Sequence, residues 1–201
     1  MSNTVVKQRT LQNEISLTGV GLHTGKDVTI TFKPAPENHG YAFQRVDLDD
    51  APIIPAKAEY VTDTQRSTNI DFKGVQINTS EHVLAALVGL GVDNCLIAMD
   101  SPEPPIMDGS SKYFVEAIEK AGILEQDAEI EEYIVKEVIS YLDEESGCEI
   151  TLIPSNEYQV TTMVDYGTEV LGTQNASLKT ISDFKAEISD SRTFSFLHEI
   201  E

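Results

Sequence analysis

The stretch Val28-Thr29-Ile30-Thr31-Phe32-Lys33-Pro34 alternates polar and apolar residues and ends at a proline, which predicts a strand with one buried face. A similar stretch returns later as Cys148-Glu149-Ile150-Thr151-Leu152-Ile153-Pro154. A second pair of similar segments follows in the same order, Asp63-Thr64-Gln65-Arg66-Ser67-Thr68 and Asp190-Ser191-Arg192-Thr193. Two matches in one order, at similar separations, predict an internal repeat of one α+β unit.

The first unit also contains patterns of further strands and of two helices. One helix is expected after Asn78, because Glu81 stands three residues on, at the spacing of a capping box, and Gly89 and Gly91 end the pattern. A second helix is expected over about 111–121, where apolar residues recur at helical spacing before a glycine. Further strands are predicted at 41–46, 74–78 and 94–99.

An acidic stretch over 125–132 lacks aromatic residues and is typical of a solvated linker. We therefore predict an α+β fold of two similar sheet-plus-helix domains, the first over 1–126 and the second over 130–201. The second domain is expected to hold strands at 133–142, 148–153 and 158–164 and a short helix at 182–189. A counterpart of the helix after Asn78 would lie beyond Glu201, so this domain is expected to be incomplete in the chain.

The charge balance excludes several classes of partner. The chain has 201 residues with 14 Lys and Arg against 34 Asp and Glu, a net charge of −20. Such an acidic surface does not suit nucleic acid or an anionic membrane. No apolar run is long enough to span a bilayer, and the polar start Met1-Ser2-Asn3-Thr4 does not resemble a signal peptide. Cys95 and Cys148 are expected to be buried thiols, and the chain is expected to be cytoplasmic.

The adjacent pair Glu81-His82 is the first candidate for chemistry. Imidazole is a common zinc ligand, and a nearby carboxylate can accept a proton from metal-bound water. The alternative is structural, because Glu is an ordinary residue near a helix N-terminus and a lone His is usually a surface or core group. One His is also too few for a catalytic zinc site, which needs about three protein ligands.

Three other segments indicate a binding or catalytic role less strongly. Gly19-Val20-Gly21-Leu22-His23-Thr24-Gly25 is better explained as a tight strand–turn than as a dinucleotide site, because the glycine spacing is wrong. Asp108 is expected to cap a helix or to order the loop before it. Thr193 offers a hydroxyl that could donate a hydrogen bond to a developing oxyanion.

Taken together, several motifs resemble the zinc-dependent UDP-3-O-acyl-N-acetylglucosamine deacetylases of lipid A synthesis. The resemblance runs in order from about residue 7 to the end of the chain. It rests on these segments: Lys7-Gln8-Arg9-Thr10-Leu11, the glycine segment 19–25, Phe32-Lys33-Pro34-Ala35-Pro36, Thr79-Ser80-Glu81-His82-Val83-Leu84-Ala85-Ala86-Leu87, Gly91-Val92-Asp93-Asn94, Pro105-Ile106-Met107-Asp108-Gly109-Ser110 and Ser191-Arg192-Thr193-Phe194.

This resemblance implies two similar α+β domains with the active site between them. It implies that Glu81 is the general base, that His82 is a ligand of Zn²⁺, and that Thr193 helps to polarise the substrate carbonyl or to stabilise the oxyanion. The residues it places near the acylated UDP-N-acetylglucosamine, a small-molecule substrate, are Tyr166, Phe194, Phe196 and Glu199. Two of these depart from the family pattern, since Tyr166 replaces a phenylalanine and Glu199 stands where an aspartate is usual.

The family's other zinc ligands, a His and an Asp, and a further catalytic His match no position before Glu201. The resemblance therefore predicts that this chain is an N-terminal fragment without deacetylase activity of its own. Some members of the family are fused to a 3-hydroxyacyl-carrier-protein dehydratase, and the parent protein could carry one. The alternative is a non-catalytic sugar-nucleotide-binding module with the same fold and no metal.

Overall fold

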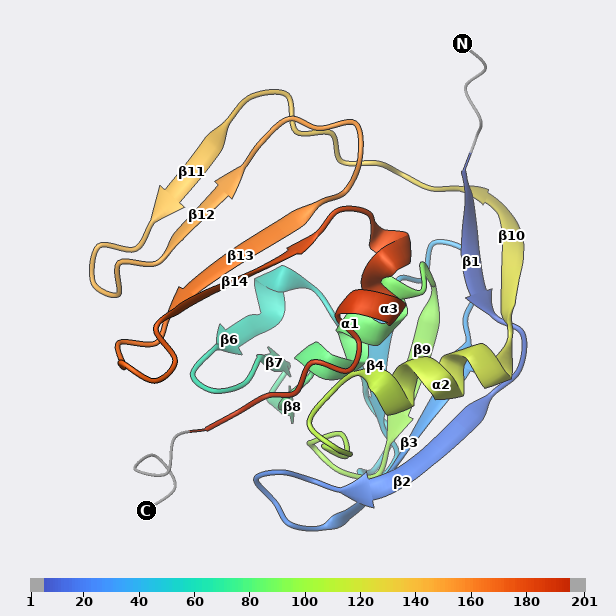
Figure 1. Cartoon of the computed structure of the whole chain (residues 1–201). Coiled ribbons are helices and arrows are strands. Elements are labelled where there is room, and N and C mark those ends of the chain that lie inside the picture. Colours follow the sequence, from blue (N-terminus) through green and yellow to red (C-terminus); the bar gives the residue numbers. More distant parts are fainter. Residues whose placement is uncertain (1–5, 196–201) are drawn as a thin grey trace.

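The computed structural model describes residues 6–195, which have the α+β fold class that the sequence predicts (Figure 1). The largest sheet has five strands in the order β2-β3-β9-β4-β5. Strands β4 and β9 run parallel, and the other neighbouring pairs in this sheet are antiparallel. The predicted strands at 28–32, 41–46 and 94–99 are thereby confirmed. The bounds are β2 (Ile15–Val20), β3 (Asp27–Pro34), β9 (Cys95–Met99), β4 (Tyr41–Arg45) and β5 (Ile53–Pro55).

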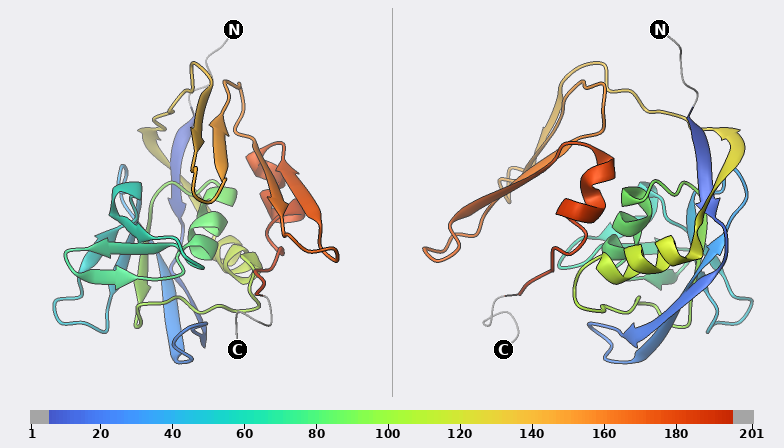
Figure 2. Two further views of the ribbon diagram at one scale, coloured as in Figure 1. Left: turned by 90° about the vertical axis from the view of Figure 1, so that its left-hand side faces the viewer. Right: turned by 45° about the vertical axis from the view of Figure 1, so that its right-hand side comes forward.

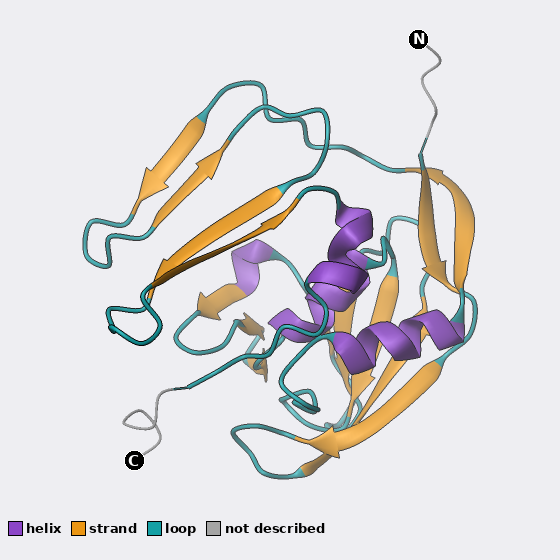
Figure 3. Cartoon of the chain, in the orientation of Figure 1, coloured by secondary structure: helices purple, strands orange, loops and turns teal. Residues whose placement is uncertain are grey.

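One face of this sheet carries the core. The alternating pattern of β3 leaves Ile30 and Phe32 fully buried. Two helices, α1 (Glu81–Gly89) and α2 (Lys112–Ala121), pack onto this core (Figure 3). The rings of Phe32 and Phe114 meet edge to face with centroids 6.1 Å apart, which joins α2 directly to β3. Both helices lie close to their predicted ranges.

Strand β1 (Lys7–Leu11) pairs antiparallel with β10 (Ile123–Glu129), which lies far from it in sequence (Figure 1). Buried amides support the pairing, since Asn94 Nδ2 donates to Gln8 Oε1 at 2.9 Å and to Gln126 Oε1 at 2.8 Å. The prediction of a solvated linker over 125–132 is therefore wrong for residues 125–129. Backbone pairing with β1 makes this acidic stretch a strand, although its composition is typical of a linker.

A further small sheet lies beside the main one and is antiparallel throughout. It contains β6 (Val61–Asp63), β7 (Asn69–Phe72) and β8 (Val75–Ile77), after the short 3-10 turn η1 (Ala58–Tyr60). Strand β8 comes just before α1, and the β6–β7 loop contains Thr68, which contacts the start of α1. We refer to residues 6–129 as the first half of the molecule.

The second half, residues 130–195, consists of two hairpins followed by a short helical segment, and the hairpins extend away from the first half (Figure 2). The strand predicted at 133–142 begins only at 139, and β14 was not predicted. The predicted helix at 182–189 is a 3-10 turn followed by one helical turn. The elements are β11 (Ile139–Leu142), β12 (Glu149–Leu152), β13 (Val160–Asp165), β14 (Thr173–Leu178), η2 (Ile181–Asp183) and α3 (Phe184–Glu187).

The two halves meet where α3 packs on α1. The Phe184 ring lies against Gly89 so closely that any Cβ at Gly89 would overlap it. Phe184 and Leu178 are the second half's contribution to the main core. On the adjacent surface, Lys185 Nζ forms an ion pair with Glu119 Oε1 of α2 at 2.6 Å. An apolar groove between α1, α3 and the β13–β14 hairpin continues this contact.

The two cysteines differ in their surroundings. Cys95 lies in β9 and is fully buried, and burial raises the pKa of its thiol to about 12. Cys148 precedes β12 and is exposed, so the prediction of a buried thiol is wrong there. The reason is that the β11–β12 hairpin is not covered by any other element among the described residues.

Candidate functional site

The start of α1 is fixed by the β6–β7 loop. Thr79 has a φ of 55°, a left-handed conformation that stops the helix from beginning earlier. Ser80 is the N-cap residue, and its backbone N and its Oγ both donate to the carbonyl of Thr68, at 3.2 and 2.9 Å. The predicted capping box is therefore wrong, because Glu81 occupies the first helical position and not the third.

Glu81 is instead held by the backbone of the loop. Its Oε2 accepts a hydrogen bond from Thr68 N at 2.9 Å. Its Oε1 lies 3.9 Å from His82 Nε2. The Glu81 side chain is 37% exposed and that of His82 is 18% exposed, so both reach solvent. The structure thus brings this predicted pair together, with one carboxylate oxygen anchored and the other beside the imidazole.

His82 is also connected to the start of α2. The hydroxyl of Ser111, the N-cap residue of α2, donates to the backbone carbonyl of His82 at 3.0 Å. Because Ser111 is buried, this contact fixes the two helix starts to each other. The segment that leads into α2, residues 106–111, therefore meets the Glu81–His82 pair at the backbone of His82, through Ser111.

Thr193 approaches the same segment from the second half of the molecule. Its backbone N donates to the carbonyl of Gly109 at 2.8 Å. Gly109 has a φ of 85°, which favours glycine, and a Cβ there would lie 3.5 Å from Thr193 Cγ2. The two predicted catalytic residues, Glu81 and Thr193, are thus supported by neighbouring parts of one framework.

Asp108 both orders its loop and reaches the second half. Its Oδ1 accepts from Ser110 Oγ at 2.6 Å and from Ser110 N at 3.2 Å, as expected of a loop-ordering residue. Its Oδ2 accepts from Arg192 Nε and Nη2, both at 3.2 Å. These hydrogen bonds, those from Ser110 first, hold the pKa of the Asp108 carboxyl below its usual value.

A fully buried carboxylate, Glu103, was missed by sequence reasoning. It accepts hydrogen bonds from His23 N and Thr24 N, each at 3.0 Å, and from Thr79 Oγ1 at 3.5 Å. It therefore joins the glycine-rich turn after β2 to the residue that precedes the cap of α1. That glycine segment is a strand–turn and no helix follows it, which agrees with the structural interpretation of its glycines. Glu103 stands between two prolines, and no local pattern in the sequence indicates its burial.

Two of the predicted substrate-contacting residues also come together. The rings of Tyr166 and Phe194 meet edge to face with centroids 5.1 Å apart. Tyr166 is half-buried, and Phe194 is exposed. The other two, Phe196 and Glu199, lie outside the described residues.

The donor set for a metal is partial. Within residues 6–195, no three His, Cys, Asp or Glu side chains converge in a way that could hold a metal ion. A catalytic zinc site takes about three protein ligands, so the imidazole of His82 fits as one member of such a set and does not complete it. None of the described helices is long and apolar enough to cross a membrane.

Comparison with known proteins gives consistent matches. The family model LpxC, UDP-3-O-acyl N-acetylglycosamine deacetylase, matches residues 8–201. The chain is 46% identical over 197 residues to a protein named bifunctional enzyme LpxC/FabZ from Bacteroides thetaiotaomicron, and 49% identical over 198 residues to one of the same name from Chlorobaculum tepidum. It is 42% identical over 195 residues to the UDP-3-O-acyl-N-acetylglucosamine deacetylase of Myxococcus xanthus.

These matches cover 98%, 98% and 96% of this chain, but 43%, 42% and 62% of the lengths of those relatives. The chain therefore spans about two fifths of the bifunctional relatives and less than two thirds of the shorter one.

Proposed function

The chain belongs to the UDP-3-O-acyl-N-acetylglycosamine deacetylase family, and from this membership we propose that it forms part of a zinc-dependent amidohydrolase. Its substrate is UDP-3-O-acyl-N-acetylglucosamine. Its products are acetate and the UDP-3-O-acyl-glucosamine with a free amine, which is used in lipid A synthesis. The reaction takes place in the cytoplasm. The observation that carries the proposal is the geometry of Glu81, with one oxygen anchored on Thr68 N and the other 3.9 Å from His82 Nε2.

In this proposal Glu81 is the general base. The hydrogen bond from Thr68 N fixes the carboxylate through Oε2, which leaves Oε1 to accept a proton from the attacking water. The water oxygen adds to the acetamido carbonyl carbon, and the proton taken up by Glu81 passes to the amide nitrogen as the C–N bond breaks, which gives the free amine and acetate. His82, together with further ligands, would hold a zinc ion, which would supply Lewis acidity and lower the pKa of water toward about 7.

Thr193 donates its hydroxyl hydrogen bond to the carbonyl oxygen as negative charge develops there. The Tyr166–Phe194 ring pair offers an apolar surface for the sugar nucleotide, and Phe196 and Glu199 are proposed to extend it. Support comes from the contact of Thr193 with Gly109, which belongs to the segment that meets the Glu81–His82 pair at the backbone of His82.

The chain spans only part of the length of its relatives, and two proposals follow for it as part of a larger protein. We propose that the 201-residue chain by itself binds no stoichiometric zinc and has no deacetylase activity, because its described residues do not bring three possible zinc ligands together. We also propose that the parent protein carries a fused dehydratase. The relatives named LpxC/FabZ are 45–49% identical to this chain, against 42–44% for the relatives named only as deacetylases.

The test is the variant Glu81→Gln in the full-length protein. The amide keeps the oxygen that accepts from Thr68 N and removes the proton acceptor, so the turnover rate should fall by roughly 100-fold or more. Glu116→Gln, on the exposed side of α2, is the matched control and should keep the parent rate. An unchanged rate in Glu81→Gln, with unfolding temperature preserved, would show that Glu81 is only structural.

The alternative is a sugar-nucleotide-binding module without catalysis, which the partial donor set would suit. Metal analysis of the purified full-length protein separates the two. About one zinc per chain supports the hydrolase, and nucleotide binding without metal supports the module.

A further inference from the structure

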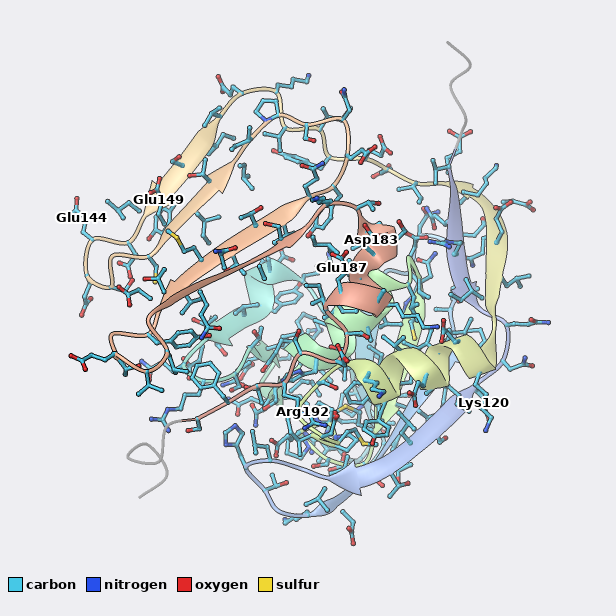
Figure 4. The ribbon with its side chains drawn as sticks, in the orientation of Figure 1. Lys120, Glu144, Glu149, Asp183, Glu187 and Arg192 are labelled. Carbon is cyan, nitrogen blue, oxygen red and sulfur yellow. The ribbon has the colours of Figure 1, made fainter. Side chains whose placement is uncertain are left out.

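We propose that the Asp108–Arg192 ion pair joins the two halves of the molecule and thereby positions the Thr193 hydroxyl. We call this ion pair the latch. This inference rests on the proposed function for the role of Thr193, but the contact itself is independent of it. The two residues stand 84 positions apart, one in the loop before α2 and the other in the extended segment after α3. Arg192 is labelled in Figure 4 on that segment.

The Asp108 carboxylate, which is the acceptor of the ion pair, is fixed in place by Ser110. Ser110 occupies Oδ1 of Asp108 through both its hydroxyl and its backbone N, which leaves Oδ2 for the guanidinium. Ser110 itself is fully buried, and its Oγ also accepts from Lys112 N at 3.2 Å at the start of α2. The Asp108 side chain is only 20% exposed, so its carboxylate is a preorganised target and not a mobile surface group.

The latch lies directly beside the residue that it positions. Arg192 precedes Thr193, whose backbone N donates to the carbonyl of Gly109, the residue after Asp108. Two adjacent residues of the second half therefore bind two adjacent residues of the first half. A side-chain ion pair and a backbone hydrogen bond at neighbouring positions fix both the place and the rotation of the segment at Thr193.

The same segment supports the other side of the site. Ser111, three residues after Asp108, donates to the carbonyl of His82. Residues 108–111 therefore connect Thr193 to the Glu81–His82 pair through a short, hydrogen-bonded path. Loss of the ion pair should release Thr193 without disturbing α1, because the contact between Ser111 and His82 does not involve Arg192.

A second ion pair between the halves provides a matched control. Lys185 and Glu119 join α3 to α2 at 2.6 Å, but neither is next to a residue assigned to the site. Arg192 is 68% exposed and Lys185 is 54% exposed, so the two pairs are similar in their access to solvent. A general loss of cohesion between the halves would follow from breaking either pair, whereas loss of positioning would follow only from breaking the latch.

The first experiment measures steady-state kinetics of the full-length protein. Arg192→Gln should lower kcat about fivefold with little change in KM, as expected for an exposed ion pair, and Arg192→Lys should recover part of the loss. Lys185→Gln should leave kcat unchanged. Thr193→Val alone should lower kcat by roughly 100-fold, and Arg192→Gln added to it should have less than about a twofold further effect. An equal loss from Arg192→Gln with and without Thr193, or an equal loss from Lys185→Gln, would overturn the proposal.

The second experiment does not depend on activity. Amide hydrogen exchange on the 201-residue chain should show the Thr193 N–H exchanging several-fold faster in Arg192→Gln than in the parent, with the amides of β3 and β9 unchanged. Unchanged exchange at Thr193 would refute the latch. If the full-length protein has no deacetylase activity at all, the proposed function fails, and the exchange result still decides whether the ion pair holds Thr193 in place.

Discussion

Strand β3 in the first half and strand β12 in the second have nearly the same sequence pattern, yet their surroundings are opposite. Ile30 of β3 is fully buried, whereas Ile150, at the matching position of β12, is 66% exposed. The difference comes from their neighbours. β3 lies between β2 and β9 beneath α1 and α2, whereas within residues 6–195 β12 pairs with β11 alone. Alternation of polar and apolar residues thus produces a strand in both places, but burial requires a covering layer.

The same contrast holds for the two halves as wholes. The main core takes nearly all of its buried residues from positions 11–121, and only Leu178 and Phe184 come from the second half. The strands of the second half expose many large apolar side chains, including Tyr141, Ile150 and Met163. Large apolar side chains exposed in such number often mark a place where other protein packs. We therefore expect the first half to be stable by itself and the second half to be the weaker part.

The largest expected effect tests this contrast with a pair of isoleucines. Ile97→Ala in β9 should destabilise the first half by about 3 kcal/mol, because it opens a cavity in a closed core. Ile150→Ala should change the free energy of unfolding by less than about 0.5 kcal/mol. Urea unfolding followed by circular dichroism measures both variants. Similar losses from the two substitutions would mean that β12 is covered in solution.

A smaller effect is expected where the halves meet. Gly89→Ala should favour helix α1 locally, but its Cβ would overlap the Phe184 ring. We expect a net loss of about 1–2 kcal/mol in the docking of α3, as is typical of overpacking. Amide exchange of residues 184–189 measures it.

The control for this prediction removes the Phe184 ring. In a Phe184→Ala background, Gly89→Ala should no longer destabilise, because the space beside the helix is then empty. Destabilisation by Gly89→Ala in both backgrounds would contradict the packing explanation.

The smallest effect concerns acid stability, and it again contrasts the halves. A hydrogen bond and ion pair from nearly buried Arg45 hold the pKa of Asp47 below its usual value. Such a group contributes stability that is present above the unfolded pKa of about 4 and is lost as the pH falls through the folded value. Asp47→Asn should therefore cost about 1 kcal/mol at pH 7 and progressively less below pH 4.

Asp143 is the matched residue of the second half. Its pKa is also lowered, by the Ser146 hydroxyl, but it lies in an exposed hairpin turn. Asp143→Asn should leave the acid unfolding of the first half unchanged. A pH-dependent loss equal to that of Asp47→Asn would show that the two halves unfold together.

Elements that are set by neighbouring residues in the sequence could be predicted well. The alternation of β3 and the end of α2 at Gly122 follow from side-chain periodicity and glycine chemistry. The β10 strand could not be predicted, because Glu125–Glu129 is acidic and becomes a strand only through pairing with β1. The start of α1 was misplaced for a related reason, since Thr68 fixes it from a loop 12 residues earlier.

The candidate site likewise combines residues that a motif predicts with residues whose partners are distant in sequence. Motifs predict Glu81, His82 and Thr193 as site residues, and the structure gives contacts that hold them. Glu103 and the Asp108–Arg192 pair were not identified, because their partners lie about 80 positions away in the sequence. Burial of a carboxylate and pairing across halves depend on topology, which no short window of sequence reveals.

The pairing of β1 with β10 has a consequence for synthesis on the ribosome. The partners of β1 lie about 120 residues downstream, so the first strand leaves the ribosome long before β10 exists. At a translation rate of about 5–20 residues per second, β1 waits for roughly 6–24 s with its hydrogen-bonding edge unpaired. All five strands of the β2-β3-β9-β4-β5 sheet leave the ribosome during this wait, so that sheet is available to fold before β10 closes the edge of β1.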